Sequence, residues 1–146
     1  MFKHILVPTD GSQLSQSAVR SAVSFAKESG ARVTAIYAKP EFRPYYVEGV
    51  KIDESVWKKT AELLDQEARE KLGFVRELCD EAGVDCTTLT VDSVVPHEAI
   101  IETAAAKGCD LIFMASHGRR GLSGLLLGSE TNKVLTHTTI PVLVFR

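Results

Sequence analysis

The segment with the clearest capacity for chemistry runs from Ala115 to Glu130 and contains four glycines. It follows an apolar run and leads into a helix expected to begin near Ser129. Glycine lets a ligand approach the backbone closely, and the amides of Gly128, Ser129 and Glu130 would be unpaired donors at the positive end of that helix. This arrangement predicts a phosphate-binding loop, with Ser129 either capping the helix or donating to a phosphate oxygen. An ordinary loop with a serine N-cap is the alternative interpretation.

Two common phosphate-binding motifs are absent from this segment. No lysine follows Gly128 and Ser129, as the GxxxxGK[ST] loop requires. Gly118, Gly121 and Gly124 are spaced three residues apart and follow a later strand, unlike the GxGxxG of dinucleotide-binding proteins. An anion site here would therefore depend mainly on backbone amides.

Polar side chains flank the same region. Asp10 lies just after the first predicted strand, where a carboxylate can accept hydrogen bonds from ribose hydroxyls or hold Mg²⁺ beside phosphates. It can equally form an Asx turn at the start of the next helix. His117, Arg119 and Arg120 can contact phosphate, although a solvated loop tip is an equally good interpretation of these side chains.

Apolar patterns typical of strands alternate along the chain with patterns typical of helices. The predicted strands cover residues 3–7, 32–38, 85–91, 110–115 and 141–145. The predicted helices lie between Ser12 and Gly30, over residues 53–82 and 96–107, and from Ser129 to before Pro141, with an irregular excursion over residues 39–49. This order predicts a single α/β domain over residues 1–146, with a doubly wound, five-stranded parallel sheet and helices on both faces.

Ligands of such sheets bind beyond the carboxyl ends of the strands, at the point where the strand order reverses. The turn that contains Asp10 follows the first strand, and the glycine-rich segment follows the fourth. If these two strands are neighbours, the two loops face each other across one crevice.

The chain resembles the universal stress proteins of the UspA type over its whole length. The resemblance rests on residues 5–12 (ILVPTDGS), on the stretch from Met114 to Ser129, and on residues 141–144 (PVLV). Nucleotide-binding members carry Gly-x₂-Gly-x₉-Gly-Ser/Thr, which Gly118, Gly128 and Ser129 match, whereas the first position is Ala115. If the backbone there needs a positive φ, alanine costs about 1 kcal/mol; if the position only approaches a ligand closely, one methyl group is tolerated.

The resemblance implies a Rossmann-like fold of the adenine nucleotide alpha hydrolase type, with strand order 3-2-1-4-5. It also implies that ATP, AMP or ADP, with or without Mg²⁺, binds in the crevice between strands one and four. The adenine would lie near Ala38 and the ribose near Asp10 and Ala115, with the phosphates on the glycine-rich segment. The site residues expected on this basis are Pro8, Thr9, Asp10, Ala38, Met114, Ala115, Ser116, His117, Gly118, Arg119, Gly128, Ser129 and Glu130.

The last predicted strand is apolar, yet this strand order places it at a sheet edge. Its residues are Val142, Leu143, Val144 and Phe145. Exposed apolar edges favour pairing with another chain, so we expect a symmetric homodimer through this strand, as the resemblance also implies. Coverage of the edge by a helix or loop is the alternative.

Charge and cysteine usage argue against several other classes. Seventeen Lys and Arg against 19 Asp and Glu give a net charge of −2, which provides no general attraction to nucleic acid or to an anionic membrane. No apolar run approaches the length of a membrane span, about 18 residues, and no signal peptide is evident. Cys79, Cys86 and Cys109 form no CxxC pair, which is typical of reduced thiols in a cytoplasmic protein.

No grouping of residues indicates turnover chemistry. The serines lack a base at a motif spacing, and the four histidines show no metal-ligand spacing. We therefore expect a non-enzymatic, nucleotide-binding stress-response protein that acts as a switch or protector, with slow ATPase or phosphotransfer activity left open. Two alternatives are a family member that has lost nucleotide binding and acts through protein contacts, which Ala115 suggests, and a flavodoxin-like FMN carrier.

Overall fold

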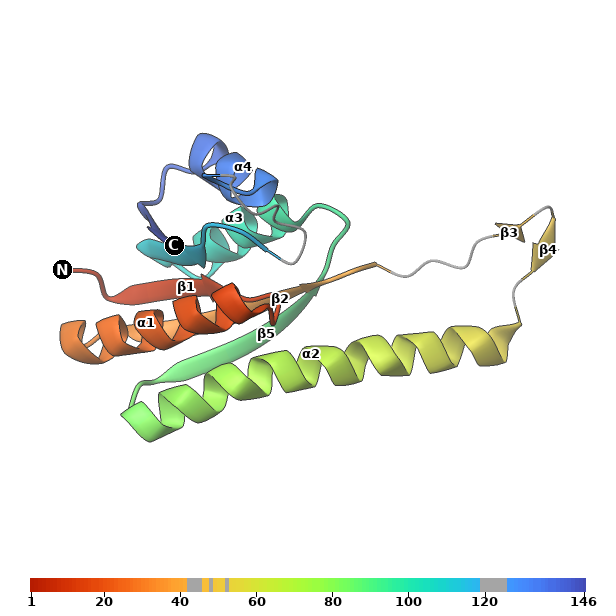
Figure 1. The fold of residues 1–146 in the computed structure, drawn as a ribbon, viewed down its shortest axis with the longest axis horizontal. Helices are drawn as coiled ribbons and strands as arrows, with labels where there is room; N and C mark the ends of the chain where they lie inside the picture. The colour runs from red at the N-terminus through yellow and green to blue at the C-terminus, as the bar shows by residue number, and fades with distance from the viewer. Residues whose placement is uncertain (42–45, 48, 52, 119–125) are drawn as a thin grey trace.

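Five parallel strands form the central sheet of the structure, which is a computed structural model describing residues 1–41, 46–47, 49–51, 53–118 and 126–146 (Figure 1). The strands are β1 (His4–Pro8), β2 (Arg32–Lys39), β5 (Cys86–Asp92), β6 (Leu111–Ala115) and β7 (Val142–Phe145). Their spatial order is β5-β2-β1-β6-β7, and every neighbouring pair is parallel. The predicted order 3-2-1-4-5 is thus confirmed.

Four helices of the described residues connect these strands. They are α1 (Gln13–Ser29), α2 (Glu54–Ala82), α3 (Pro96–Ala106) and α4 (Ser129–His137). Their starts and ends lie within one residue of those predicted, except that α4, expected to run to just before Pro141, ends at His137. Ser12 caps α1 by accepting a hydrogen bond from the Ser15 amide, as its sequence position predicts. One difference lies in the 39–51 segment, where β3 (Tyr46–Val47) and β4 (Val50–Lys51) form a short antiparallel pair instead of a wholly irregular excursion.

Side chains alternate between two hydrophobic cores, one on each face of the sheet. Ile5 and Val7 of β1 pack with α1 and α2, whereas Leu6 packs with α3 and α4 on the opposite face. Figure 1 shows the two pairs of helices on the two sides of the sheet. This alternation is the period-two pattern of a strand buried on both faces.

Strand β6 is the most completely buried strand of the described sheet. All five of its residues are buried, and Ile112 is 0% exposed. The continuous apolar run over residues 111–114 predicted a strand inside the sheet that is buried on both faces, as β6 is. Because β6 is held so firmly, the loop that follows it starts from a fixed point next to β1.

Helix α2 is packed along only part of its length. Its buried side chains, Ala68, Leu72, Val75 and Cys79, all lie in the second half of the helix. In the first half, Val56 and Leu63 are 53% and 60% exposed. Figure 1 shows this first half reaching beyond the sheet toward β3 and β4.

None of the helices formed by the described residues combines the length and the apolar composition that crossing a membrane requires.

Candidate functional site

The turn after β1 and the loop after β6 meet at the carboxyl edge of the sheet. Their strands are direct neighbours, with Ile5 opposite Leu111. A Cβ atom placed on Gly118 would lie only 2.6 Å from the Asp10 Oδ2 atom. The backbone at Gly118 is therefore packed against the Asp10 carboxylate, as expected for loops that face each other at the switch point.

The β1–α1 turn is held by its own polar side chains. Thr9 is buried, its amide donates to the Ile36 carbonyl (2.9 Å), and its hydroxyl bonds to the Ser15 hydroxyl (2.9 Å). The Ser12 amide donates to Asp10 Oδ1 (2.9 Å), which is the Asx turn considered as one interpretation of Asp10. The second carboxylate oxygen, Oδ2, lies on the side of Gly118.

The start of the glycine-rich segment contains an unusual polar group. Ser116 is 1% exposed, and its amide donates to the Phe145 carbonyl of β7 (2.7 Å). Its hydroxyl bonds to His117 Nδ1 (2.8 Å). The other ring nitrogen of His117, Nε2, is buried and has no hydrogen-bond partner within the structure as described. An unsatisfied buried nitrogen of this kind is costly, and a ligand atom at this position would remove the cost.

The start of α4 differs from the prediction in two respects. Gly128, not Ser129, is the N-cap, and no side chain caps the helix. The Gly128 amide donates to the Ser116 carbonyl (2.7 Å), so it is not the unpaired donor that was expected. The backbone at Gly128 is closely packed against the β6 loop, because a Cβ atom on Gly128 would lie 3.2 Å from the Ser116 carbonyl oxygen and 3.3 Å from His117 Cα. Ser129 is consequently the first helical residue.

The other two predicted backbone donors belong to the first residues of α4. Ser129 and Glu130 occupy the first turn of α4, where amides have no partner within the helix. They lie at the positive end of the helix dipole, on the side of the glycine-rich segment. An anion at this position would therefore meet two amides from the first turn of α4.

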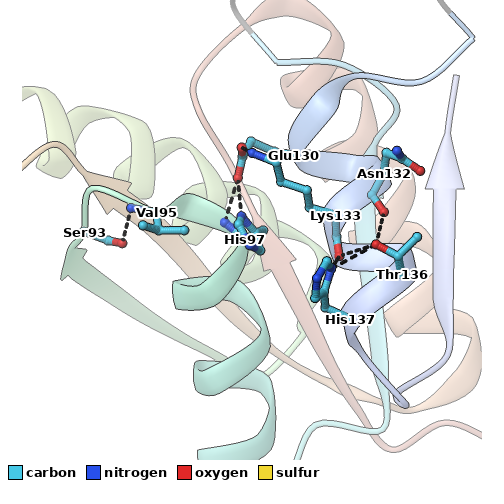
Figure 2. A network of polar contacts seen from close by, with 8 residues as sticks. All are labelled: Ser93, Val95, His97, Glu130, Asn132, Lys133, Thr136 and His137. Atoms are coloured by element: carbon cyan, nitrogen blue, oxygen red, sulfur yellow. Dashed lines mark hydrogen bonds and ion pairs between the residues drawn. The ribbon is translucent and has the colours of Figure 1, made fainter.

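The carboxylate of Glu130 has a role that the sequence did not reveal. It accepts hydrogen bonds from the His97 amide (2.9 Å) and from Lys133 Nζ (3.1 Å), and it pairs with His97 Nδ1 (3.0 Å) (Figure 2). Helix α3 has no side-chain cap of its own, so Glu130 supplies one from α4. Burial alone would raise the pKa of Glu130, but the hydrogen bonds from Lys133 and His97 outweigh it and hold that pKa below its usual value.

Replacing Glu130 with alanine is expected to lower the free energy of unfolding by about 1–2 kcal/mol at neutral pH, because a charge-assisted bond to the α3 amide is lost. The pKa of Glu130 is depressed in the folded state. The stabilisation is therefore complete above the unfolded pKa of about 4.3 and disappears as the pH falls through the lower folded pKa. Urea unfolding at several pH values measures this difference.

Glu102→Ala, which removes an exposed carboxylate from α3, is the matched control for this experiment. It is expected to change the free energy of unfolding by less than about 0.5 kcal/mol. Equal losses for the two variants, or a Glu130→Ala loss that persists unchanged at acid pH, would contradict the proposed cap.

Ala115, where the resemblance implies the first glycine of the nucleotide-binding motif, is the last residue of β6. It is paired with Phe145, and its methyl group packs in the core beneath α1 and α2. A strand residue has a negative φ, so this position makes no demand for glycine conformation. The Ala115 carbonyl accepts a hydrogen bond from the buried Thr131 hydroxyl (3.0 Å), which ties the end of β6 to α4.

The other expected site residues differ in where they lie. Pro8 and Ala38 lie at the carboxyl ends of β1 and β2, at the same edge as Asp10. Met114 is 6% exposed and packs in the core beneath α3 and α4, so only its backbone can approach a ligand. Arg119 lies outside the described residues.

The universal stress protein family model matches residues 1–146, which is the whole chain. The chain belongs to the universal stress protein family. It is 38% identical over 146 residues to the universal stress protein MJ0531 of Methanocaldococcus jannaschii, covering all of this chain and 83% of that protein.

Solved universal stress protein structures have the same fold as this family member. The structure of MJ0577 from Methanocaldococcus jannaschii has a TM-score of 0.80 and 30% identity, covering 99% of this chain and 96% of that one. Two more distant structures, each with a TM-score of 0.67, were solved with adenine nucleotides. One is in complex with cAMP (24% identity, 99% and 97% coverage), and the other, from Archaeoglobus fulgidus, is in complex with dAMP (19% identity, 99% and 98% coverage).

In this universal stress protein, Lys71 lies beside the β1–α1 turn, and the sequence patterns did not predict its place there. Its side chain is 9% exposed, and its Nζ atom contacts Glu67 (2.6 Å) and the Tyr37 hydroxyl (3.2 Å). Its aliphatic part covers Gly11, where an added Cβ atom would lie 2.8 Å from Lys71 Cε. Together with Thr9, Lys71 and Gly11 line a cavity of about 180 Å³. The position of Lys71 among the buried residues of α2 could have predicted that its side chain faces the sheet.

Lys39, the last residue of β2, lies at the same sheet edge next to Ala38. Its Nζ atom contacts Asp65 of α2 (2.6 Å) and Asp92 of β5 (3.1 Å). The hydrogen bond to Asp65 is the main cause that raises the pKa of Lys39. Among the described residues, no group of three or more His, Cys, Asp and Glu side chains is arranged to hold a metal ion. A magnesium ion beside Asp10 would therefore need phosphate and water as its other ligands.

Proposed function

We propose that this universal stress protein binds an adenine nucleotide where the β1 and β6 loops meet, and that the bound nucleotide acts as a conformational switch or protector. The observation that carries the proposal is the packing of Gly118 against Asp10, where a Cβ atom would fall 2.6 Å from the carboxylate. Bare backbone beside a carboxylate, at the edge where two strands diverge, suits a ribose and its phosphates.

The residues present fit each part of such a ligand. The Ser129 and Glu130 amides face the side on which phosphates would lie. With the Ser116 hydroxyl donating to Nδ1, His117 Nε2 carries a proton that a phosphate oxygen can accept, which would satisfy this buried nitrogen. Asp10 Oδ2 would accept from ribose hydroxyls, and the adenine would lie beside Ala38.

The cAMP and dAMP complexes of the distant universal stress proteins support the choice of an adenine nucleotide. ATP, ADP or AMP, with or without Mg²⁺, is proposed as the ligand here. We propose binding without efficient turnover, in a cytoplasmic protein whose cysteines are free thiols. Release of phosphate above background, abolished by Asp10→Ala, would instead establish a slow ATPase.

Calorimetric titration of the purified protein with ATP, ADP and AMP up to millimolar concentration tests this function. We expect heat of binding from at least one of the three nucleotides. A flat titration with all three would overturn the proposal. Ala115→Gly separates the proposal from its alternative: similar affinity supports a site that already functions, whereas a large gain supports a protein that has lost nucleotide binding and acts through protein contacts.

We further propose that the protein forms a symmetric homodimer through β7. This strand lies at the edge of the sheet, and Val142, Leu143, Val144 and Phe145 are all partly exposed. Ile112 donates to the Pro141 carbonyl (2.9 Å), and Ser116 donates to the Phe145 carbonyl (2.7 Å). Because inward and outward groups alternate along a strand, the Val144 amide faces the outer side of the sheet.

Val144→Pro is expected to convert the dimer to a monomer of 15.9 kDa without unfolding it, because proline removes only the outward amide of an edge strand. Light scattering coupled to size exclusion measures the mass. Val144→Thr, which keeps the amide, is the control and should remain dimeric. A folded Val144→Pro protein that stays dimeric would contradict an interface through β7.

A further inference from the structure

Two cysteines lie on either side of the turn that joins α2 to β5, away from the proposed nucleotide site. Cys79 is in the last turn of α2, and Cys86 is the first residue of β5. Between them the chain reverses at Gly83, which has a φ of +72°, and the Val84 amide donates to the Cys79 carbonyl (2.8 Å). The helix end and the strand start are thus held close together.

A second contact sets which residues of α2 face which residues of β5. Arg76 donates to the Thr88 hydroxyl (2.9 Å). Cys79 follows Arg76 by three residues and lies on the same side of the helix, and Cys86 precedes Thr88 by two and lies on the same side of the strand. Because the two elements run in opposite directions, the contact between Arg76 and Thr88 places Cys79 opposite Cys86.

The surroundings of the two thiols differ. Cys79 is 0% exposed within the core beneath α1 and α2, whereas Cys86 is only partly buried at the edge of the same core. Cys86 is therefore the thiol that a small oxidant reaches first. Cys109 is buried in the other core, on the opposite face of the sheet, so it cannot pair with either of them.

We propose that Cys79 and Cys86 are a hydroperoxide-sensitive thiol pair that oxidises to an intramolecular disulfide. The Cys86 thiolate attacks hydrogen peroxide, breaks the O–O bond and forms a sulfenic acid with release of hydroxide. The Cys79 sulfur then attacks the Cys86 sulfur and displaces the hydroxyl group, which leaves as water with the Cys79 proton. Two thiols and one peroxide thus give one disulfide and two waters. This modification site is independent of the proposed nucleotide function.

The electrostatics assign the same roles to the two cysteines. A hydrogen bond from the Cys79 thiol is the main cause that lowers the pKa of Cys86, and the Arg76 guanidinium acts in the same direction. The same interaction, together with burial, raises the pKa of Cys79. Burial raises the pKa of Cys109 to about 11, so this third thiol remains protonated and does not compete with Cys86 for peroxide.

Oxidation of the reduced full-length protein with hydrogen peroxide tests the proposal. Intact mass spectrometry should show the loss of two hydrogen atoms, and thiol titration should fall from three groups to one. Cleavage after Asp80, Glu81 or Asp85 separates the two cysteines, so their fragments should remain joined until a reductant is added. Cys79→Ser and Cys86→Ser should each abolish the mass loss, whereas the matched variant Cys109→Ser should keep it.

Three results would overturn the thiol pair. The first is that all three thiols still titrate after peroxide treatment. The second is that Cys86 gains oxygen atoms while Cys79 stays a thiol, and the third is that the disulfide joins two chains. Each of these outcomes is distinguishable from a failure of nucleotide binding, because the assay contains no nucleotide.

Discussion

Gly128→Val is expected to weaken ATP binding by about tenfold to a hundredfold. A Cβ atom at this position meets the Ser116 carbonyl oxygen at 3.2 Å and His117 Cα at 3.3 Å, both of which are backbone atoms. The start of α4 must therefore move away from the β6 loop, and the Ser129 and Glu130 amides move with it. Overpacking of this kind costs about 1–3 kcal/mol. A tenfold change in affinity corresponds to about 1.4 kcal/mol.

Gly73→Val provides a matched control within the same chain. Gly73 lies within α2, and an added Cβ atom would meet nothing within 4 Å. The control should leave nucleotide affinity unchanged and alter the free energy of unfolding by less than about 0.5 kcal/mol, because valine and glycine differ little in helix propensity. Unchanged affinity in a folded Gly128→Val protein would show that the start of α4 does not contact the nucleotide.

Ile112→Ala is expected to have the largest effect on stability. Ile112 is 0% exposed in β6, between β1, which leads into the turn that contains Asp10, and the edge strand β7. Truncating a fully buried isoleucine costs about 2–5 kcal/mol, a large part of the total stability of about 5–15 kcal/mol that is typical of a domain. The midpoint of urea unfolding should fall accordingly, with an unchanged denaturant slope.

Graded substitutions make this second prediction more specific. Ile112→Val should cost about 0.5–1.5 kcal/mol. Leu135→Ala on α4, where the side chain is 38% exposed, should cost less than Ile112→Ala. If Leu135→Ala proved as costly as Ile112→Ala, the β6 side chains would not be more important to the core than a half-exposed residue of α4.

The main elements of the fold follow from short-range patterns. The apolar run over residues 111–114 predicted the buried strand β6, Pro96 predicted the start of α3, and Gly83 predicted the end of α2. These patterns report on local backbone preference and on burial, so they do not depend on knowing the partner element. The strand order came instead from the resemblance to universal stress proteins, because no local pattern specifies which strands are neighbours.

The candidate site was less predictable, because its details depend on contacts between distant residues. Glu130 and His97 are 33 residues apart. Neither residue type predicts that a side chain of α4 caps the start of α3. The Gly128 amide was assigned to phosphate, but it bonds to the Ser116 carbonyl, which the fold brings within 2.7 Å. For the same reason Ser129, the better N-cap by residue type, loses that position to Gly128.

The uneven packing of α2 has a consequence for its dynamics. Amides in the second half, around Leu72 and Val75, are expected to exchange hydrogen for deuterium only through unfolding of the whole domain. In the first half, Val56 and Leu63 are exposed and the contact of Asp65 with Lys39 lies close to its end, so the helix has little tertiary support there. Such a segment is marginally stable in water, and its amides should exchange through local fraying. Helix α2 is thus one continuous helix whose two halves open independently of each other. The boundary between them lies just before Ala68, its first buried residue.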